Sequence, residues 1–202
     1  MRTPGQIARP KRRWPFYFLI SSPIPRARIY SRDMPSTASL AGRTAIVLIA
    51  SDRCFAGTQT DLSGPAIVRI LTAAGAEIVE AVTLPDELDQ LTSALRSAAA
   101  RASLILTTGG TGLARRDVTP EATLAVSTRL VPGLAELIRQ DGARQTPFAA
   151  LGRGVCVVSG NSLILNLPGN PSGAESSLRA VLPLLPHALD LLAGKTEHPA
   201  ER

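Results

Sequence analysis

One segment of this 202-residue chain combines glycines, arginines and an acid at a spacing that suits phosphate binding. It has the letters TTGGTGLARRDVTP and runs from Thr107 to Pro120. Three glycines in four residues let backbone N–H groups face a ligand, because no Cβ atom obstructs the approach. The arginines could neutralise phosphate oxygens, and the acid could hold magnesium, which prefers oxygen ligands and bridges phosphates. The candidate binding residues are Thr108, Gly109, Gly110, Thr111, Gly112, Arg115 and Arg116, with Asp117 as the candidate metal ligand.

The segment fits neither of two common phosphate-binding motifs. No Gly-Lys-Ser/Thr follows, so it is not a Walker A motif, and Arg115 takes the third glycine position of a dinucleotide fingerprint. An ordinary glycine turn with a solvated arginine pair is the simplest alternative. A helix start is predicted at Thr119-Pro120, with Thr119 as the cap and Pro120 at the first helical position. It favours phosphate binding, because the positive end of a helix dipole attracts anions.

A second turn, Leu167–Pro171, is predicted to lie at the same edge of the central β-sheet as the Thr107–Pro120 segment. Asn170 is predicted to cap the next helix and Pro171 to begin it, so the free N–H groups of that helix point outward. From this segment alone, a tight turn without function is an equally good interpretation. Two helix N-termini at one edge together favour a polyphosphate site. To this second turn we assign the candidate binding residues Pro168, Gly169, Asn170 and Pro171.

Acidic residues follow the first two predicted strands. Asp52 comes shortly after the first strand, Asp61 lies in the loop that follows, and Asp86 comes after the second strand. Ligands of open α/β sheets bind outside the carboxyl ends of the strands. We therefore expect Asp52 and Asp86 near Asp117. Helix capping by itself accounts for Asp86, whereas several carboxylates beside a phosphate site would suit a shared cation.

Hydrophobic periodicity predicts the strands that must position these residues. Apolar runs of strand length occur at residues 44–50, 77–84, 103–108, 154–159 and 162–167. The last two are separated by Gly160-Asn161, a hairpin turn signal. Strands that alternate with helices predict an α/β fold, a three-layer sandwich whose mostly parallel sheet contains one antiparallel hairpin.

Two helices are predicted between the first three strands. The first covers residues 63–74, with Ser63 as N-cap and Gly75 as its stop. The second covers residues 86–101, with apolar residues at helical spacing and Asp86 as its N-cap.

Charge and aromatic content argue against a nucleic-acid partner. The first 33 residues hold eight basic side chains and one acid, whereas the rest of the chain holds 14 basic and 15 acidic side chains. The formal net charge of +6 therefore comes from the N-terminal end and predicts no basic patch on the folded body. Phe55 and Phe148 are the only aromatic residues after residue 33, too few for a base-stacking platform.

The first 40 residues differ from the rest in charge, aromatic content and proline. Lys11–Arg13 followed by Trp14–Ile20 resembles a signal peptide, but about seven apolar residues are too few to span a bilayer. We predict that residues 1–40 form a disordered or non-native extension, with Met34 as a candidate initiator. Residues 41–202 are predicted to form one domain, with no membrane partner.

The cysteines and histidines suggest neither a metal centre nor covalent catalysis. Cys54 and Cys156 lie outside any Cys/His metal spacing, and the apolar neighbours of Cys156 predict a core position. Free cysteines fit a reducing compartment, so we expect a cytoplasmic protein. His187 and His198 lie outside the Thr107–Pro120 and Leu167–Pro171 segments. Ser/His or Cys/His catalysis is therefore unsupported. Nucleotidyl transfer suits what remains, because it needs positioning and charge neutralisation more than acid–base groups.

At these residues the sequence resembles the molybdopterin adenylyltransferases of molybdenum-cofactor synthesis, the MoaB/Mog family. The likeness is carried by TTGGTGLARRDVTPEAT at Thr107–Thr123, LILNLPGNPSGAE at Leu163–Glu175 and SDRCFAGTQTDLSGP at Ser51–Pro65. It runs from about Arg43 to Gly194 and leaves the first 40 residues outside. Two departures concern loop detail: Leu113 stands where a proline is common in the family, and Gly152 where a serine is common.

The resemblance implies an α/β sandwich that assembles as a homotrimer and binds ATP and molybdopterin together, with Mg²⁺ assisting. The terminal phosphate of the pterin would attack the α-phosphorus and release pyrophosphate. Asp86 and Asp117 would be the functional acids and the candidate metal ligands. The Thr107–Pro120 segment (the glycine loop) and Pro168–Pro171 (the PGNP turn) would form the nucleotide and pterin pockets together with Ser51 and Asp52. The molybdenum-insertion enzyme becomes a candidate partner.

Two alternatives stay open at this point. A non-catalytic molybdopterin-binding or scaffolding paralogue would share the fold, although the presence of Asp86 and Asp117 favours the enzyme. Some other nucleotide-using α/β enzyme would require the long motif match to be accidental.

Overall fold

The computed structural model describes residues 39–195. Most of the predicted N-terminal extension, residues 1–38, therefore lies outside the described residues, as do residues 196–202. Leu40, the last residue of that predicted extension, is fully buried, and its N–H donates to the carbonyl of Ala74 at 2.7 Å. Leu40 is thus part of the packed core.

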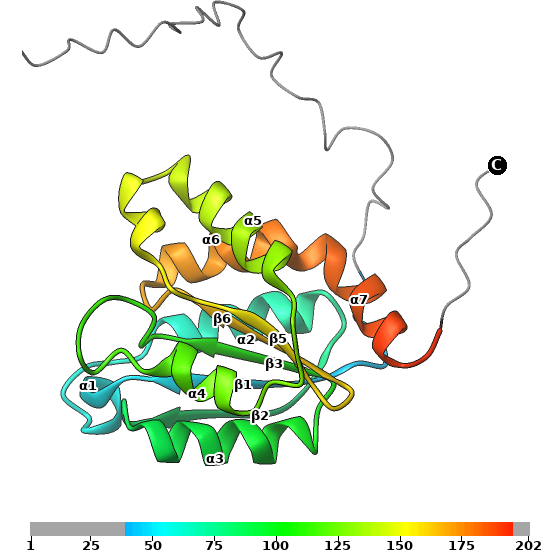
Figure 1. Cartoon of the computed structure of the whole chain (residues 1–202), viewed down its shortest axis with the longest axis horizontal. Helices are drawn as coiled ribbons and strands as arrows, with labels where there is room; N and C mark the ends of the chain where they lie inside the picture. Colours follow the sequence, from blue (N-terminus) through cyan, green and yellow to red (C-terminus); the bar gives the residue numbers. More distant parts are fainter. Residues whose placement is uncertain (1–38, 196–202) are drawn as a thin grey trace, which may run out of the picture. The chain divides into compact units, whose positions relative to one another are not determined.

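A six-stranded sheet forms the centre of the fold, in the order β2-β1-β3-β6-β5-β4 (Figure 1). The first four strands of this order run parallel, and β5 and β4 are antiparallel to their neighbours. The strands are β1 (Thr44–Ala50), β2 (Glu77–Leu84), β3 (Leu104–Thr108), β4 (Arg129–Leu130), β5 (Cys156–Ser159) and β6 (Ser162–Leu167). The predicted mostly parallel sheet and its β5–β6 hairpin are confirmed.

Helices cover both faces of the sheet, as the predicted three-layer sandwich requires (Figure 1). One face packs against α2 (Ser63–Ala73), α5 (Pro132–Ala143), α6 (Pro171–Val181) and α7 (Leu185–Leu192). The other packs against α3 (Leu88–Ala99) and α4 (Thr119–Ala125). The described part of the chain also contains three short helices: α1 (Asp52–Phe55) and the 3₁₀ turns η1 (Pro147–Leu151) and η2 (Leu182–Leu184).

The apolar run of β1 is buried on both faces, which is why it shows no alternation with polar residues. Ala45, Val47 and Ile49 belong to the core cluster on the α2 side of the sheet. Their neighbours Ile46 and Leu48 belong to the cluster on the α3 side. Each large aliphatic side chain buried in this way stabilises the fold by about 1.5–3 kcal/mol. The loops that follow the strands are therefore carried by a firmly packed sheet.

The predicted N-cap of the first long helix is wrong. α2 begins at Ser63, but the N-cap position is Leu62, which makes no side-chain cap bond. The carboxylate of Asp61 instead accepts the N–H groups of Ser63 at 2.9 Å and Gly64 at 3.1 Å. A charged carboxylate two residues upstream reaches both free N–H groups, so it displaces the serine hydroxyl from this task.

Two further caps are also wrong, and both bear on the site. α3 begins at Leu88 with Glu87 in the cap position, so Asp86 does not cap a helix. Val118 occupies the cap position of α4, and the hydroxyl of Thr119 is buried without a hydrogen-bond partner. The side chains of Asp86 and Thr119 are therefore not used for capping.

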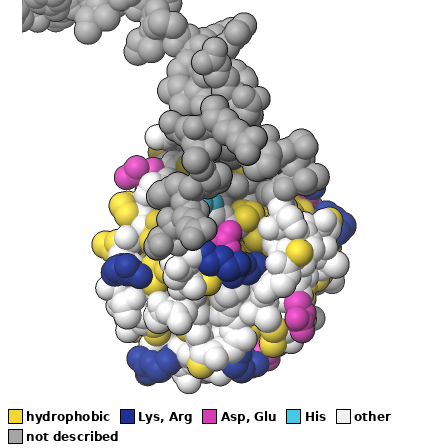
Figure 2. All heavy atoms as spheres, turned by 90° about the vertical axis from the view of Figure 1, so that its right-hand side faces the viewer, with side chains coloured by type: hydrophobic (Ala, Val, Ile, Leu, Met, Phe, Trp, Pro, Cys, Tyr) yellow, Lys and Arg dark blue, Asp and Glu magenta, His cyan; other side chains and the backbone are white. Residues whose placement is uncertain are grey.

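Cys156 lies in the core as predicted, and burial raises the pKa of its thiol to about 12. No helix within residues 39–195 is long and apolar enough to cross a membrane. On the face of the molecule drawn in Figure 2, basic and acidic side chains are interspersed among uncharged ones. That face shows no continuous basic field among its described residues.

Candidate functional site

The loops of the candidate site begin side by side because the parallel strands end in register. Ala50 of β1 lies beside Leu84 of β2, and Thr108 of β3 lies between Ile49 of β1 and Leu167 of β6. The residues that follow these strand ends therefore all lie at the same edge of the sheet. This edge receives Asp52, Asp86, the glycine loop and the PGNP turn, as the sequence predicts.

The glycine loop packs too closely for side chains at its first two glycines. Gly109 has φ of 91°, and a Cβ there would overlap the carbonyl oxygen of Ala50. Gly110 has φ of 60°, and a Cβ there would overlap the Thr119 hydroxyl and lie 3.0 Å from Asp86 Oδ1. Both backbones adopt the left-handed region that favours glycine. The loop backbone thus lies directly over the ends of β1 and α4.

The PGNP turn contacts the glycine loop. The hydroxyl of Thr108 donates to the carbonyl of Pro168 at 2.7 Å, and a Cβ on Gly169 would lie 3.0 Å from the Cα of Gly109. Asn170 caps α6 by accepting the N–H of Gly173 at 2.6 Å, as predicted. The two turns therefore form one continuous backbone surface.

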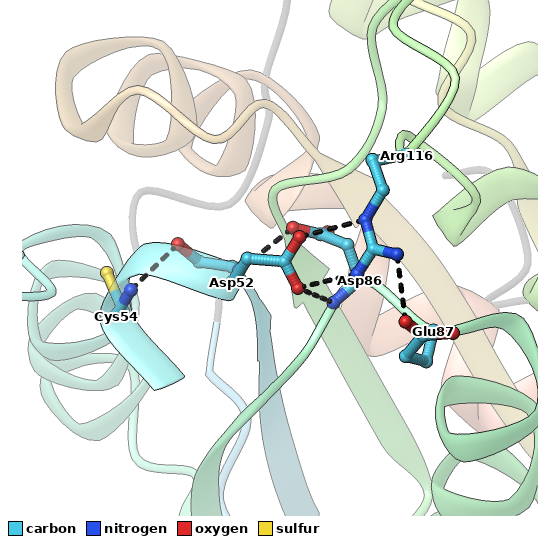
Figure 3. Close-up of polar contacts among 6 residues, drawn as sticks. Asp52, Cys54, Asp86, Glu87 and Arg116 are labelled. Atoms are coloured by element: carbon cyan, nitrogen blue, oxygen red, sulfur yellow. Dashed lines mark hydrogen bonds and ion pairs between the residues drawn. The ribbon is translucent and has the colours of Figure 1, made fainter. Parts of the chain in front are cut away.

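Asp52 and Asp86 hold each other through reciprocal bonds (Figure 3). The N–H of Asp52 donates to Asp86 Oδ2 and the N–H of Asp86 donates to Asp52 Oδ1, both at 3.0 Å. The loops after β1 and β2 are thus joined directly. This pairing is what turns Asp86 away from the helix cap.

Arg116 crosses from the glycine loop to both of these loops (Figure 3). Its guanidinium donates to the two carboxylate oxygens of Asp52 at 2.9 Å each and to Glu87 Oε1 at 2.8 Å. The bonds from Arg116 lower the pKa of Asp52, and the same bonds raise the pKa of Arg116. Arg115 is exposed and makes no ion pair with any residue in the described part of the chain.

Asp86 keeps one carboxylate oxygen without a partner. Its Oδ1 is buried and accepts no hydrogen bond. The Thr119 hydroxyl, which lies close to Gly110, is also buried without a hydrogen-bond partner. Burial raises the pKa of Asp86, and the negative charges of Asp52 and Asp117 raise it further. Asp117 accepts the N–H of Ala114 at 2.8 Å through its Oδ2. Both acids thus lie beside the glycine loop.

Two clefts meet at the glycine loop. We call them the acidic cleft, about 580 Å³ and lined by Asp52, Asp61 and Asp86, and the helical cleft, about 640 Å³ between α5, η1 and α6. Both are lined by Gly110, Asp117, Gly169 and Asn170. Four other predicted site residues line the acidic cleft: Ser51, Thr108, Gly109 and Pro171. Three others line the helical cleft: Thr111, Gly112 and Pro168. Arg115 and Arg116 line neither cleft.

Sequence reasoning did not foresee Asn166 or Arg153. Asn166 is a buried polar residue within the apolar strand β6, and its amide donates to the hydroxyls of Thr107 and Thr123 at 2.9 Å each. Its Oδ1 accepts the N–H of Val155 at 3.1 Å. One asparagine in the run SLILNL was the available signal, because a buried amide requires partners. Arg153 hydrogen-bonds to the glycine loop itself.

Among the described residues, no group of three or more His, Cys, Asp or Glu side chains could hold a metal ion. The acidic cleft offers the unpartnered Asp86 Oδ1 and the nearby Asp117 carboxylate. Magnesium commonly takes one or two carboxylates and fills its other positions with water and substrate phosphates. The donor set fits a cation that is held jointly with a phosphate substrate.

Residues 46–187 match a family model described as a "probable molybdopterin binding domain". The chain belongs to this molybdopterin-binding domain family. The match spans β1 to α7 and includes both turns of the candidate site. Membership of this family accounts for the resemblance found in the glycine loop and the PGNP turn.

Curated relatives of this molybdopterin-binding domain include enzymes and larger proteins. The chain is 40% identical to a molybdopterin adenylyltransferase of Helicobacter pylori over 73% of its own length and 86% of that protein. It is 41% identical over 72% of its length to the molybdenum cofactor synthesis protein cinnamon of Drosophila melanogaster. The chain spans only 25% of cinnamon, so it corresponds to one part of that protein.

A solved structure shares the same fold. The molybdopterin biosynthesis enzyme MoaB of Thermus thermophilus superposes with a TM-score of 0.72 at 51% identity. The superposition covers 76% of this chain and 98% of that one. The α/β sandwich derived from the sequence is therefore the fold of the family.

Proposed function

We propose that this chain is a molybdopterin adenylyltransferase, which transfers AMP from ATP to the terminal phosphate of molybdopterin. The observation that carries the proposal is the junction of two clefts at Gly110, Asp117, Gly169 and Asn170. A reaction that joins two phosphate-bearing substrates needs both phosphates at one point. The adenylyltransferase name of the Helicobacter relative supports the same activity.

In the proposed reaction, an oxygen of the pterin phosphate forms a bond to the α-phosphorus of ATP. The bond from that phosphorus to the bridging oxygen of the β-phosphate breaks, and pyrophosphate leaves with the electron pair. The protein's task is to align the groups and neutralise charge. The backbone N–H groups of Gly110 and Gly169, and the N-terminus of α6, would face the phosphates at the junction.

The two arginines of the motif would have different tasks. Arg115 is exposed and has no ion-pair partner in the described residues, so we assign it to phosphate neutralisation. Arg116 already bonds to Asp52 and Glu87, so we assign it to holding the glycine loop against the loops after β1 and β2.

Asp86 and Asp117 would hold magnesium together with phosphate oxygens and water. The buried Oδ1 of Asp86 lacks any other partner, which supports a cation at that place. When bound, the ion would supply positive charge that offsets the charge on the phosphates.

We also propose, on the basis of the family resemblance, that the chain works as a cytoplasmic homotrimer and passes its product to a molybdenum-insertion enzyme. Sedimentation equilibrium of the full chain measures the oligomeric state directly. A monomer at working concentration would exclude the trimer and leave the catalytic proposal intact.

The decisive experiment is incubation of the purified full chain with molybdopterin, ATP and Mg²⁺, followed by mass spectrometry. We expect adenylyl-molybdopterin and one pyrophosphate for each product formed. The control replaces ATP by an analogue whose α–β bridge cannot be cleaved, and it should give no product. Binding of molybdopterin without an ATP-dependent product would instead establish the alternative, a non-catalytic binding or scaffolding paralogue.

A further inference from the structure

Arg153 bonds to the glycine loop at several points although it lies outside the motif. It lies in the short segment between η1 and β5. Its backbone N–H donates to the carbonyl of Thr111 at 3.0 Å, and its Nε donates to the carbonyl of Gly112 at 2.7 Å. Its Nη2 donates to the carbonyl of Asp117, and its Nη1 donates to the carboxylate of Glu121. One residue thus reaches both ends of the loop and the helix after it.

These bonds restrain the backbone that carries the carboxylate of Asp117. The Arg153 guanidinium is a planar fork whose donors have fixed directions, so bonding two carbonyls at once fixes their separation. The carbonyl of Asp117 is held by Arg153, and its Oδ2 accepts the N–H of Ala114 from within the loop. The loop can therefore change its curvature only by breaking a bond to Arg153.

Arg153 has firm support of its own. The carbonyl of the next residue, Gly154, accepts a bond from Nη1 of Arg139 on α5 at 2.9 Å. On the other side of the loop, Arg116 bonds to Asp52 and Glu87. The glycine loop is therefore held from two directions by two arginines, and only Arg116 belongs to the motif.

The ion pair with Glu121 is a minor part of this arrangement. The side chains of Arg153 and Glu121 are 34% and 47% exposed. Exposed pairs of this kind typically contribute 0–1 kcal/mol to stability. The carbonyl bonds act directly on the loop, so Arg153 affects its shape more than the overall stability.

We propose that Arg153 is a positioning residue for the transfer reaction: it holds the backbone of Gly112 and Asp117 so that the Asp117 carboxylate faces the junction of the two clefts. This inference rests on the proposed function. Arg153 touches no reacting atom and acts through the loop alone.

The test compares Arg153→Lys with the matched control Glu121→Gln in the full chain. Lysine keeps the charge but cannot bond both carbonyls, whereas Glu121→Gln removes only the ion pair. We expect Arg153→Lys to lower kcat on the order of 10–100-fold, the size of effect expected when reacting groups are misplaced by about an ångström. The KM for ATP should change less than about threefold, because the substrate contacts remain. Glu121→Gln should keep kcat within about threefold of the wild type.

Amide hydrogen exchange over residues 111–117 gives a readout that needs no substrate. We expect faster exchange in Arg153→Lys and unchanged exchange in Glu121→Gln, because local opening follows the loss of loop bonds. A wild-type kcat in Arg153→Lys, an equal loss of kcat in both variants, or a slow Arg153→Lys enzyme with wild-type exchange would each overturn the proposal. If the wild type forms no adenylylated product, the proposed function fails, and the exchange result still decides whether Arg153 holds the loop.

Discussion

The two clefts that flank the glycine loop are built from opposite kinds of contact. Loops after β1 and β2 form the acidic cleft, where Asp52 and Asp86 bond to each other and Arg116 bonds to Asp52. The helical cleft is walled by apolar residues such as Ile138 and by Phe148, which is 75% exposed. Carboxylates concentrate in the acidic cleft and large apolar side chains in the helical cleft, and Asp117 lines both.

This contrast suits a site that binds two large substrates, as the proposed function requires. Phosphates require fixed charges and backbone N–H groups, whereas a ring system gains most from apolar contact. Because the clefts meet at the glycine loop, substitutions at the junction should impair the transfer itself. Substitutions inside a single cleft should affect the binding of a substrate.

The largest effect is expected for Asp117→Asn at the junction. The change keeps the shape of the side chain and removes its charge, so the fold should persist while kcat falls on the order of 10²–10³-fold. Single-turnover AMP transfer measures the loss, and thermal unfolding serves as the control. Normal adenylylation by this variant would remove Asp117 from the proposed machinery.

A smaller effect should separate the two arginines of the motif. Arg115→Gln should raise the KM for ATP about tenfold, the size of one hydrogen bond to a charged group. Arg116→Gln should lower kcat more than it raises KM, because it releases Asp52 and Glu87 rather than a substrate contact. Steady-state kinetics at two salt concentrations measure both. The same pattern of KM and kcat in both variants would contradict this division.

Phe148→Ala should weaken the binding of a ring-bearing substrate in the helical cleft. Loss of an aromatic contact costs about 0.5–1.5 kcal/mol, or roughly two- to tenfold in Kd. Calorimetric titration with molybdopterin and with an ATP analogue, performed separately, shows which substrate is affected. Exposed Phe55 lines neither cleft, so Phe55→Ala is the matched control. Unchanged Kd values for both substrates would exclude Phe148 from the site.

The smallest effect is expected for Glu121→Gln, on the free energy of unfolding and its dependence on pH. The hydrogen bond from Arg153 holds the pKa of Glu121 below its usual range. A carboxylate with a lowered folded-state pKa contributes stability above its unfolded pKa and loses it as pH falls through the folded value. Glu121→Gln should therefore be less stable than wild type at pH 7 by at most about 1 kcal/mol, because both side chains of the pair are partly exposed to solvent. Urea unfolding should show this difference shrinking below about pH 4, and a difference that grows in acid would contradict it.

The amino-acid pattern predicted the three layers of the fold and the sheet edge where the candidate site lies. The run Thr44–Ala50 predicted β1 correctly, and Gly160-Asn161 predicted the β5–β6 hairpin, because these signals are local. Helix α5 and the two-residue strand β4 were not predicted. The proline at the start of α5 was an available signal for that helix. Strand β4 has only two residues, which are too few to show an alternation of apolar and polar side chains.

The hydrogen-bond partner of each polar group, in contrast, depends on the folded arrangement of the chain. Asp86 and Ser63 fit the pattern of helix caps, but Asp52, 34 residues before Asp86, and the nearby Asp61 carboxylate take their places. Arg153 carries no sequence signal for its bonds to Gly112 and Asp117, which are 41 and 36 residues away. Periodicity follows from the burial of each residue's own side chain and is therefore visible locally. A hydrogen-bond partner depends on which strands the sheet places side by side.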